Sequence, residues 1–272
     1  MRIVQIIDSL NTGGAERMAV NYANALSKQA EFSGLIVTRK EGLLLNQIDK
    51  RTSYLFLNKR KSFDIKALLV LRKFLKKNKV DIIQAHSSSF FISILVKLTL
   101  PKIKIIWHDH YGITQNLAIR KNIILKFSSF LFLGIVSVNT SLKTWAESYL
   151  YCKNVTYLPN FIYQSDLKQD QFILKGTEGK RIICVANLRP QKNHHLLIEG
   201  ASVLHEKFPD WTFHCIGKDF KDNYSKKLKE KVSRLNLQET VFFYDAVNNV
   251  SSILEQGDIA VLTSLSEGLP LA

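Results

Sequence analysis

Short apolar runs alternate with helix-like segments along most of this chain of 272 residues. The run RIVQIID (2–8) precedes a helical segment at 15–28, and the same order of strand and helix continues to residue 264. Strands separated by helices form right-handed βαβ units, whose strands pair in parallel sheets. The sequence therefore predicts an α/β protein, with its functional loops at the carboxyl ends of the strands.

The expected elements fall into two series. In the first series we expect strands at 2–8, 32–38, 80–86, 102–110, 133–139 and 154–160, with helices at 15–28, 63–78 and 89–98. In the second we expect strands at 181–187, 211–217, 240–246 and 258–264, with helices at 193–208, 223–235 and 248–256. The polar stretch QSDLKQDQ (164–171) reads as a linker between them. We therefore expect two domains, 1–163 and 164–272, the second incomplete because it stops at the first residues of a helix.

Composition indicates a folded protein of the cytosol. The chain is 46% hydrophobic and 22% charged, as globular proteins are, and its three widely spaced cysteines argue against a disulfide framework or a zinc site. Its start reads directly as a strand, which argues against a signal peptide. The most apolar stretches, 90–100 and 123–138, are shorter than the roughly 20 residues of a membrane span. We expect both to be buried core elements.

Positive charge is concentrated in the first domain. Residues 1–163 contain 24 Lys and Arg against 9 Asp and Glu, whereas residues 164–272 contain 14 of each. A merely well-solvated surface does not predict so clean a division, so we expect an anionic partner for the first domain. Nucleic acid is disfavoured, because the basic segments lack the interleaved aromatic residues on which bases stack.

Two adjacent glycines, Gly13 and Gly14, stand where the first strand leads into the first helix. Glycine lets an anion approach the backbone, and the N-terminus of a helix offers free N–H groups. The spacing is not G-x-G-x-x-G and no P-loop lysine follows, so neither a Rossmann dinucleotide site nor a Walker NTPase is indicated. From these residues alone, a phosphate-binding loop and a structural turn are both open.

Histidines end two of the expected strands. WHDHYG (107–112) contains His108, a possible general base near neutral pH or a histidine held by backbone carbonyls. If the strand continues through this motif, we expect the rings of His108 and His110 to point in opposite directions, which argues against a metal site. His86, at the end of VDIIQAH, is more readily interpreted as structural.

The second domain carries charged residues at two strand ends. Arg189 and Lys192 precede a helix and could clamp a diphosphate, or simply be solvated. In SLSEGLP, Glu267 could accept hydrogen bonds from sugar hydroxyls while the N–H groups of Gly268 and Leu269 face an anion. Alternatively, Glu267 is an ordinary acidic residue at a helix N-terminus.

Together, these motifs resemble the retaining family 4 glycosyltransferases of the GT-B fold. The matching pieces are GGAER, DIIQAH, IIWHDH and LPNFI in the first domain, then VANLRPQKNHHLLIEG, VFFYDAVNNV and GDIAVLTSLSEGLPLA in the second. The resemblance follows the order of the family along essentially the whole chain. It implies two Rossmann-like domains with parallel sheets facing across a cleft, a nucleotide-sugar donor held mainly by the second domain, and no obligatory metal.

The resemblance also implies roles for individual residues. Gly13 and Gly14 would approach the donor phosphates. His108 matches the active-site histidine that contacts the transferring sugar or the acceptor. Lys192 matches the lysine that neutralises the diphosphate leaving group, and Glu267 matches the first glutamate of an E-x7-E motif that holds the donor sugar.

Three positions depart from the family pattern. Ala186-Asn187 stand where the family usually has Gly-Arg, and we expect Arg189 to substitute for the missing arginine. Asp245 stands where a glycine is common. The second glutamate of E-x7-E, which normally binds the ribose, would follow the last residue of this sequence.

The resemblance implies a front-face substitution in which the leaving diphosphate helps to deprotonate the acceptor. The protein then supplies positioning and charge stabilisation instead of a nucleophile. We expect retaining transfer from a UDP- or GDP-sugar to a glycan or lipid-linked acceptor in cell-surface polysaccharide biosynthesis. The alternatives are a GT-B sugar-nucleotide epimerase, and a truncated non-catalytic relic or membrane-associated binding protein.

A lipid-linked acceptor would bring the basic domain to an anionic membrane. There, each nearby cation contributes about 1 kcal/mol. The expected basic surface is made of KRK (59–61) and, at the end of the next helix, Arg72, Lys73, Lys76, Lys77 and Lys79. We therefore expect a cytoplasmic protein, peripheral on the inner face of the plasma membrane.

Overall fold

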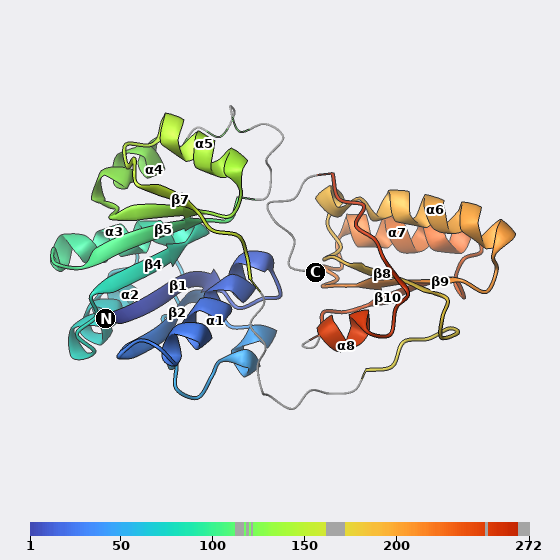
Figure 1. Ribbon diagram of the computed structural model, residues 1–272, viewed down its shortest axis with the longest axis horizontal. Coiled ribbons are helices and arrows are strands. Elements are labelled where there is room, and N and C mark those ends of the chain that lie inside the picture. The colour runs from blue at the N-terminus through green and yellow to red at the C-terminus, as the bar shows by residue number, and fades with distance from the viewer. Residues whose placement is uncertain (112–116, 118–119, 121, 162–171, 248–249, 266–272) are drawn as a thin grey trace. The chain divides into compact units, whose positions relative to one another are not determined.

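The computed structural model in Figure 1 describes residues 1–111, 117, 120, 122–161, 172–247 and 250–265. These residues form two compact units, 1–161 and 172–265, each built on its own parallel sheet. The predicted α/β class with two parallel sheets is confirmed. The expected linker at 164–171, and with it the expected domain boundary, lies outside the described residues.

The first unit has seven parallel strands in the order β3-β2-β1-β4-β5-β6-β7 (Figure 1). Their bounds are Arg2–Ser9 (β1), Phe32–Lys40 (β2), Ser53–Phe56 (β3), Ile82–His86 (β4), Lys104–Asp109 (β5), Gly134–Ser137 (β6) and Val155–Tyr157 (β7). The chain first runs outward from β1 to β3 and then returns to β4 on the other side of β1. The strand order therefore reverses between β1 and β4, and in such sheets ligands bind outside the carboxyl ends of the strands at this point.

Helices cover both faces of this sheet. Their bounds are Gly14–Ser27 (α1), Ile65–Lys77 (α2), Phe90–Thr99 (α3), Ile123–Ser128 (α4) and Thr140–Tyr149 (α5), with short 3-10 helices at Leu43–Gln47 (η1), Ser87–Ser89 (η2) and Ser129–Leu131 (η4). A core around Leu35 and Val37 packs under α1, and a larger core around Trp107 packs under α2 to α5. The crossovers from β1 to β3 run in one direction along the sheet, and those from β3 to β7 run in the other. Because each crossover is right-handed, α1 lies on one face of the sheet and α2 to α5 lie on the opposite face.

The second unit has four parallel strands in the order β10-β9-β8-β11. Its elements are β8 (Arg181–Val185), α6 (His194–Lys207), β9 (Thr212–Ile216), α7 (Asn223–Arg234), β10 (Val241–Tyr244), α8 (Val250–Leu254) and β11 (Ile259–Ala260), with the 3-10 helix η5 at Pro190–Lys192. A side chain at Gly217 would place its Cβ 2.2 Å from the backbone oxygen of Ala186. Glycine therefore lets the segments after β8 and β9 approach closely.

One expectation about the core is wrong. The stretch 123–138 is not buried throughout, because Ile123, Ile124, Phe127 and Phe130 of α4 and η4 are exposed. Only one face of this short segment meets the sheet, where Leu125 is buried. The stretch 90–100 forms helix α3, which buries Phe90, Ile92 and Val96 on one face. Among the described residues, no helix is long and apolar enough to cross a membrane.

Candidate functional site

The glycine pair lies at the end of β1, where the strand order reverses. Gly13 is the N-cap of α1 with an extended backbone (φ −139°), and neither Gly13 nor Gly14 has a positive φ. A Cβ added to Gly13 would meet only the mobile end of the Glu16 side chain, at 2.2 Å. The turn itself therefore does not require glycine at position 13. The Glu16 carboxylate, which accepts a hydrogen bond from Ser9 Oγ at 3.0 Å, lies against this helix N-terminus.

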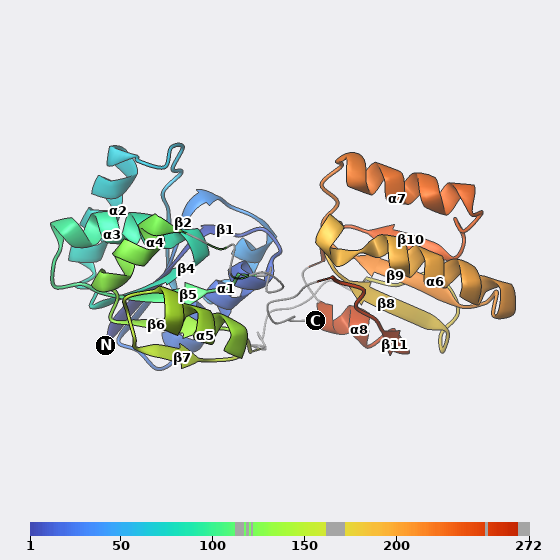
Figure 2. The ribbon, with the colours of Figure 1, turned by 90° about the horizontal axis from the view of Figure 1, so that it is seen from above.

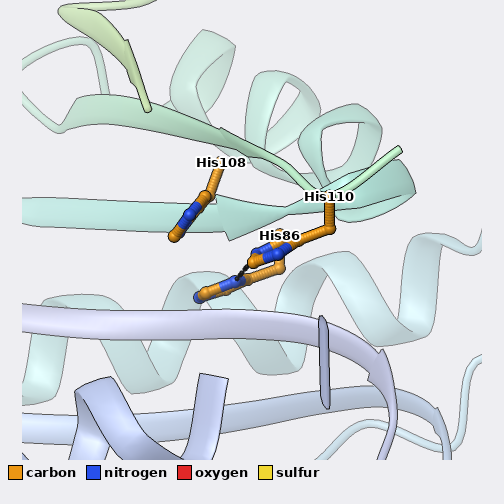
Figure 3. A group of neighbouring side chains, drawn as sticks. All are labelled: His86, His108 and His110. Atoms are coloured by element: carbon orange, nitrogen blue, oxygen red, sulfur yellow. Dashed lines mark hydrogen bonds between the residues drawn. The ribbon is translucent and has the colours of Figure 1, made fainter. Parts of the chain in front are cut away.

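Three histidines gather at the ends of β4 and β5 (Figure 3). His86 pairs with His108 in the parallel register, and both are fully buried, whereas His110 is half-buried. The ring centroids of His108 and His110 are 4.0 Å apart, and each lies 5.1 Å from that of His86. The expectation that His108 and His110 point in opposite directions is wrong, since residues two apart on a strand share a face.

Hydrogen bonds define the protonation of these rings. His86 Nε2 lies 2.8 Å from Gln5 Oε1, which can only accept, so His86 carries its proton on Nε2. His86 Nδ1 then accepts from His110 Nε2–H at 2.9 Å, which leaves Nδ1 of His110 as an acceptor. Gln84 Nε2 donates to His108 Nδ1 at 2.9 Å, so His108 carries its proton on Nε2. These assignments follow from the partners of each nitrogen.

Burial keeps the cluster neutral. It lowers the pKa of His86 and His108 well below the ordinary value and that of His110 to about 3. Tyr22, on α1, lies with its ring 5.4 Å from that of His108, and burial raises its pKa to about 12. His108 Nε2, Gln5 Nε2 and Tyr22 Oη are buried without a hydrogen-bond partner among the described residues. Among the three rings, that of His110 is partly exposed, and its Nδ1 can accept a hydrogen bond from a hydroxyl group.

The same cluster is the one group in the described part of the chain with the spacing of a metal site. One nitrogen from each ring lies within 4.8 Å of the other two. Neutral imidazoles are ligands for zinc and other late first-row metals. Each of these rings already has a hydrogen-bonding partner in Gln5, Gln84 or a second histidine. The expectation that no metal is obligatory stays a prediction.

A buried ion pair fixes the end of β5 from the opposite face of the sheet. Asp109 and Arg120 form two hydrogen bonds, of 2.6 and 2.8 Å. The Arg120 guanidinium also lies 4.2 Å from the ring centroids of Tyr111 and Trp145. Burial raises the pKa of Asp109, and the hydrogen bonds from Arg120 oppose that rise. This pair fixes Asp109, which lies between His108 and His110 in the sequence.

In the second unit, three cations follow two adjacent strands. Arg189 and Lys192 come after β8, and Lys218 comes after β9. The Arg189 guanidinium and the Lys218 ammonium lie 4.7 and 5.5 Å from the ring centroid of Phe220. Asn187, which stands where the family usually has arginine, accepts a hydrogen bond from the Lys218 N–H at 2.8 Å. Sequence reasoning did not select Lys218, although a Gly-Lys pair directly after an apolar strand was an available signal.

His194, also not selected from the sequence, begins α6. It is fully buried. Burial lowers its pKa to about 4. Its backbone N–H donates to Tyr224 Oη at 3.0 Å, which occupies one of the free donors at this helix N-terminus.

The structure brings the predicted residues together in two groups. His108 joins His86 and His110 in the first unit, and Arg189 lies on the same strand-end segment as Lys192 in the second. Glu267, Gly268 and Leu269 lie outside the described residues.

Comparisons with known proteins agree with this architecture. Residues 12–164 match the family model Glycosyltransferase Family 4, and residues 165–272 match Glycosyl transferases group 1. The Escherichia coli UDP-Gal:alpha-D-GlcNAc-diphosphoundecaprenol alpha-1,3-galactosyltransferase is 26% identical over 99% of this chain and 74% of its own length. A Campylobacter jejuni GalNAc-alpha-(1->4)-GalNAc-alpha-(1->3)-diNAcBac-PP-undecaprenol alpha-1,4-N-acetyl-D-galactosaminyltransferase is 27% identical, over 99% and 75%.

Solved structures give the fold. Anabaena HepE in complex with UDP and glucose superposes with a TM-score of 0.72 at 14% identity, covering 97% of this chain and 74% of that one. The expected GT-B fold is confirmed by such neighbours.

Proposed function

The chain belongs to glycosyltransferase family 4 and is a glycosyltransferase, and from this we propose that it transfers a sugar from a nucleotide-diphosphate donor to a lipid-linked glycan, with retention of configuration. One observation carries the donor class: Arg189, Lys192 and Lys218 follow the adjacent strands β8 and β9. Strand ends with several cations suit a diphosphate. The UDP bound by HepE and the diphosphoundecaprenol in the name of the E. coli relative support the two substrate classes.

On the donor side, we assign Lys192 to the diphosphate that leaves during the reaction. Arg189 takes the place of the missing arginine, with its guanidinium held over Phe220. Preorganised cations that face the developing charge lower the barrier without rearranging during the reaction. The resemblance adds Glu267, Gly268 and Leu269 to the donor site.

We assign Gly13 and Gly14, at the N-terminus of α1, to the donor phosphates as well. A phosphate at this helix end requires the Glu16 carboxylate to turn away, because the two are negatively charged and would occupy the same place.

On the sugar side, the histidine cluster provides neutral hydrogen-bonding groups. The resemblance assigns the contact with the sugar or the acceptor to His108, which is fully buried. We therefore assign that contact to the half-buried His110 through its Nδ1, with His108 packed against it. In the reaction, the acceptor oxygen bonds to the anomeric carbon as the bond from that carbon to the phosphate oxygen breaks. The acceptor proton passes to the leaving diphosphate. The imidazoles orient hydroxyl groups and remain neutral throughout.

A lipid-linked acceptor would lie at a membrane surface, so we propose that the protein works at an anionic cytoplasmic leaflet. Support comes from the positive net charge of residues 1–163, including the basic segment 59–79. Lys59, expected as part of this surface, is instead buried. Cations near such a surface each contribute about 1 kcal/mol to binding.

The test is a transfer assay with the purified chain. Radiolabelled UDP- and GDP-sugars are each incubated with and without an undecaprenyl-diphosphate-linked sugar, and the label in the lipid phase is measured. We expect acceptor-dependent label from one donor, in the anomeric configuration of that donor by NMR. An inverted product would contradict the retaining mechanism. An altered nucleotide sugar without acceptor would favour the epimerase, and neither transfer nor nucleotide binding would favour the non-catalytic alternative.

A further inference from the structure

Helix α4 and the residues after it present a row of large apolar side chains to solvent. Leu125 and Phe132 are buried and anchor the segment to the core. The exposed members, here called the apolar ridge, are Ile123, Ile124, Phe127, Phe130, Leu131 and Leu133. Each is between 38% and 68% exposed. Single exposed apolar residues are ordinary, but a contiguous group of this size marks an interaction surface.

The ridge is held in place by its neighbours. The Tyr151 N–H donates to Ser129 Oγ at 2.9 Å, and the Tyr151 ring stacks on Phe130 with 4.0 Å between centroids. Lys126 Nζ lies 4.9 Å from the ring centroid of Tyr149 and 5.3 Å from that of Tyr151. Phenylalanine, tyrosine and lysine side chains together are typical of a boundary between apolar and polar surroundings. The apolar surface is therefore preformed, with a cation at its edge.

The part of the chain that contains the ridge is strongly basic. Residues 59–133 contain 15 Lys and Arg and only 3 acidic residues, Asp64, Asp81 and Asp109. Asp64 caps α2, Asp81 accepts a hydrogen bond from the Arg2 N–H at 2.9 Å, and Asp109 is paired with Arg120. All three carboxylates are therefore already engaged. Such a surface complements a partner that is both apolar and negatively charged.

The ridge is part of a larger layer. Helices α2, α3 and α4 lie side by side on one face of the sheet (Figure 2). Exposed apolar side chains also occur on the other two helices, at Ile65 and Leu69 of α2 and Leu98 of α3. The basic segment 59–79 includes α2, so the layer combines apolar and basic groups.

We propose that the apolar ridge inserts into the headgroup region of an anionic bilayer, with Lys126 and the cations of α2 against the lipid phosphates. An anionic leaflet offers both an apolar interior and a negative surface, as these residues require. The proposal rests on the proposed function in that a lipid-linked acceptor would be met at this surface. It differs from binding through basic residues alone, because apolar insertion supplies affinity that salt does not screen.

Vesicle cosedimentation tests the ridge. The wild-type chain is compared with the triple variant Ile124→Ser, Phe127→Ser and Phe130→Ser, on vesicles of phosphatidylcholine with about 30% phosphatidylglycerol. The matched control is Leu196→Ser, Val203→Ser and Phe208→Ser in the second unit, at side chains 50% to 65% exposed. Because all six are exposed, neither variant should unfold the chain, which thermal melting verifies.

We expect the ridge variant to lose at least about thirtyfold in vesicle partitioning and the control to change by less than about twofold. Wild-type binding should persist in part at about 0.5 M salt. Wild-type-like binding by the ridge variant, or equal loss in the control, would overturn the proposal. So would a wild-type dimer that the ridge variant converts to monomer while neither binds vesicles.

The transfer assay separates this proposal from the proposed function. Ridge-dependent vesicle binding without transfer to any acceptor would leave membrane docking standing and would contradict the proposed transfer to a lipid-linked glycan. Transfer to a lipid-linked acceptor, together with vesicle binding that is unchanged in the ridge variant, would support the proposed function and overturn the membrane role of the ridge.

Discussion

The strand ends of the two units carry opposite chemistry on similar architecture. In the first unit, β4 and β5 lead into the buried, neutral histidines His86, His108 and His110. In the second, β8 and β9 lead into Lys192 and Lys218, with Arg189 beside them. An imidazole can be buried because it sheds its proton, whereas lysine and arginine at neutral pH need water or an anion. In the proposed function, the first unit therefore supplies neutral groups for hydroxyls, and the second unit supplies the cations for the diphosphate.

The largest expected effect comes from removing a cation of the second unit. Lys192→Gln should slow transfer by about a hundredfold to a thousandfold, because the leaving diphosphate loses a preorganised positive charge. The rate is measured in the radiolabel assay at saturating acceptor. Lys207→Gln, at the exposed end of α6, is the matched control and should retain the wild-type rate. Equal rates for the Lys192 variant and the wild type would remove the assigned role of this residue.

Breaking the buried ion pair of the first unit should instead reduce stability. Arg120→Met leaves Asp109 uncompensated in the core and should lower the free energy of unfolding by about 3 kcal/mol. Lys143→Met removes the exposed partner of Glu147 and should cost less than about 1 kcal/mol. Urea titration followed by tryptophan fluorescence measures both variants. Similar losses in the two would show that the end of β5 is not held by this pair.

The smallest expected effect is a dependence of stability on pH. The folded-state pKa of His110 is about 3, below its ordinary value, so the unfolded chain takes up this proton first as the pH falls. The stability is therefore fully present above about pH 6.5 and decreases below it. Between about pH 7 and pH 5.5, His110→Gln should lose about 1 kcal/mol less than the wild type in free energy of unfolding. An identical pH dependence in the two proteins would show that folding does not shift the pKa of His110.

Much of the fold was predictable because buried parallel strands are continuous apolar runs. The expected 2–8 and 181–187 correspond to β1 and β8 within two residues at each end. Strand β3 (Ser53–Phe56) was missed, since a half-buried edge strand of four residues gives little pattern. The segment 123–133 was misjudged because hydrophobicity does not distinguish a core helix from an exposed apolar surface.

The sequence predicted where the site residues lie along the chain, but not which of them come into contact in the fold. Order along the chain placed Gly13 and Lys192 after strands and His108 at a strand end. The contact between His86 and His110 depends on β4 and β5 being neighbours, which order alone does not specify. The Arg189–Phe220 stacking likewise requires β8 and β9 to be adjacent.

The division of roles between the units is tested most directly by calorimetric titration of UDP and of GDP into the wild type, Lys192→Gln and His110→Gln. For the nucleotide that the wild type binds, we expect the Lys192 variant to bind at least about tenfold more weakly, and the His110 variant to bind within about twofold of the wild type. Equal loss in both variants, or unchanged binding by the Lys192 variant, would contradict the assignment of the diphosphate to the cations of the second unit.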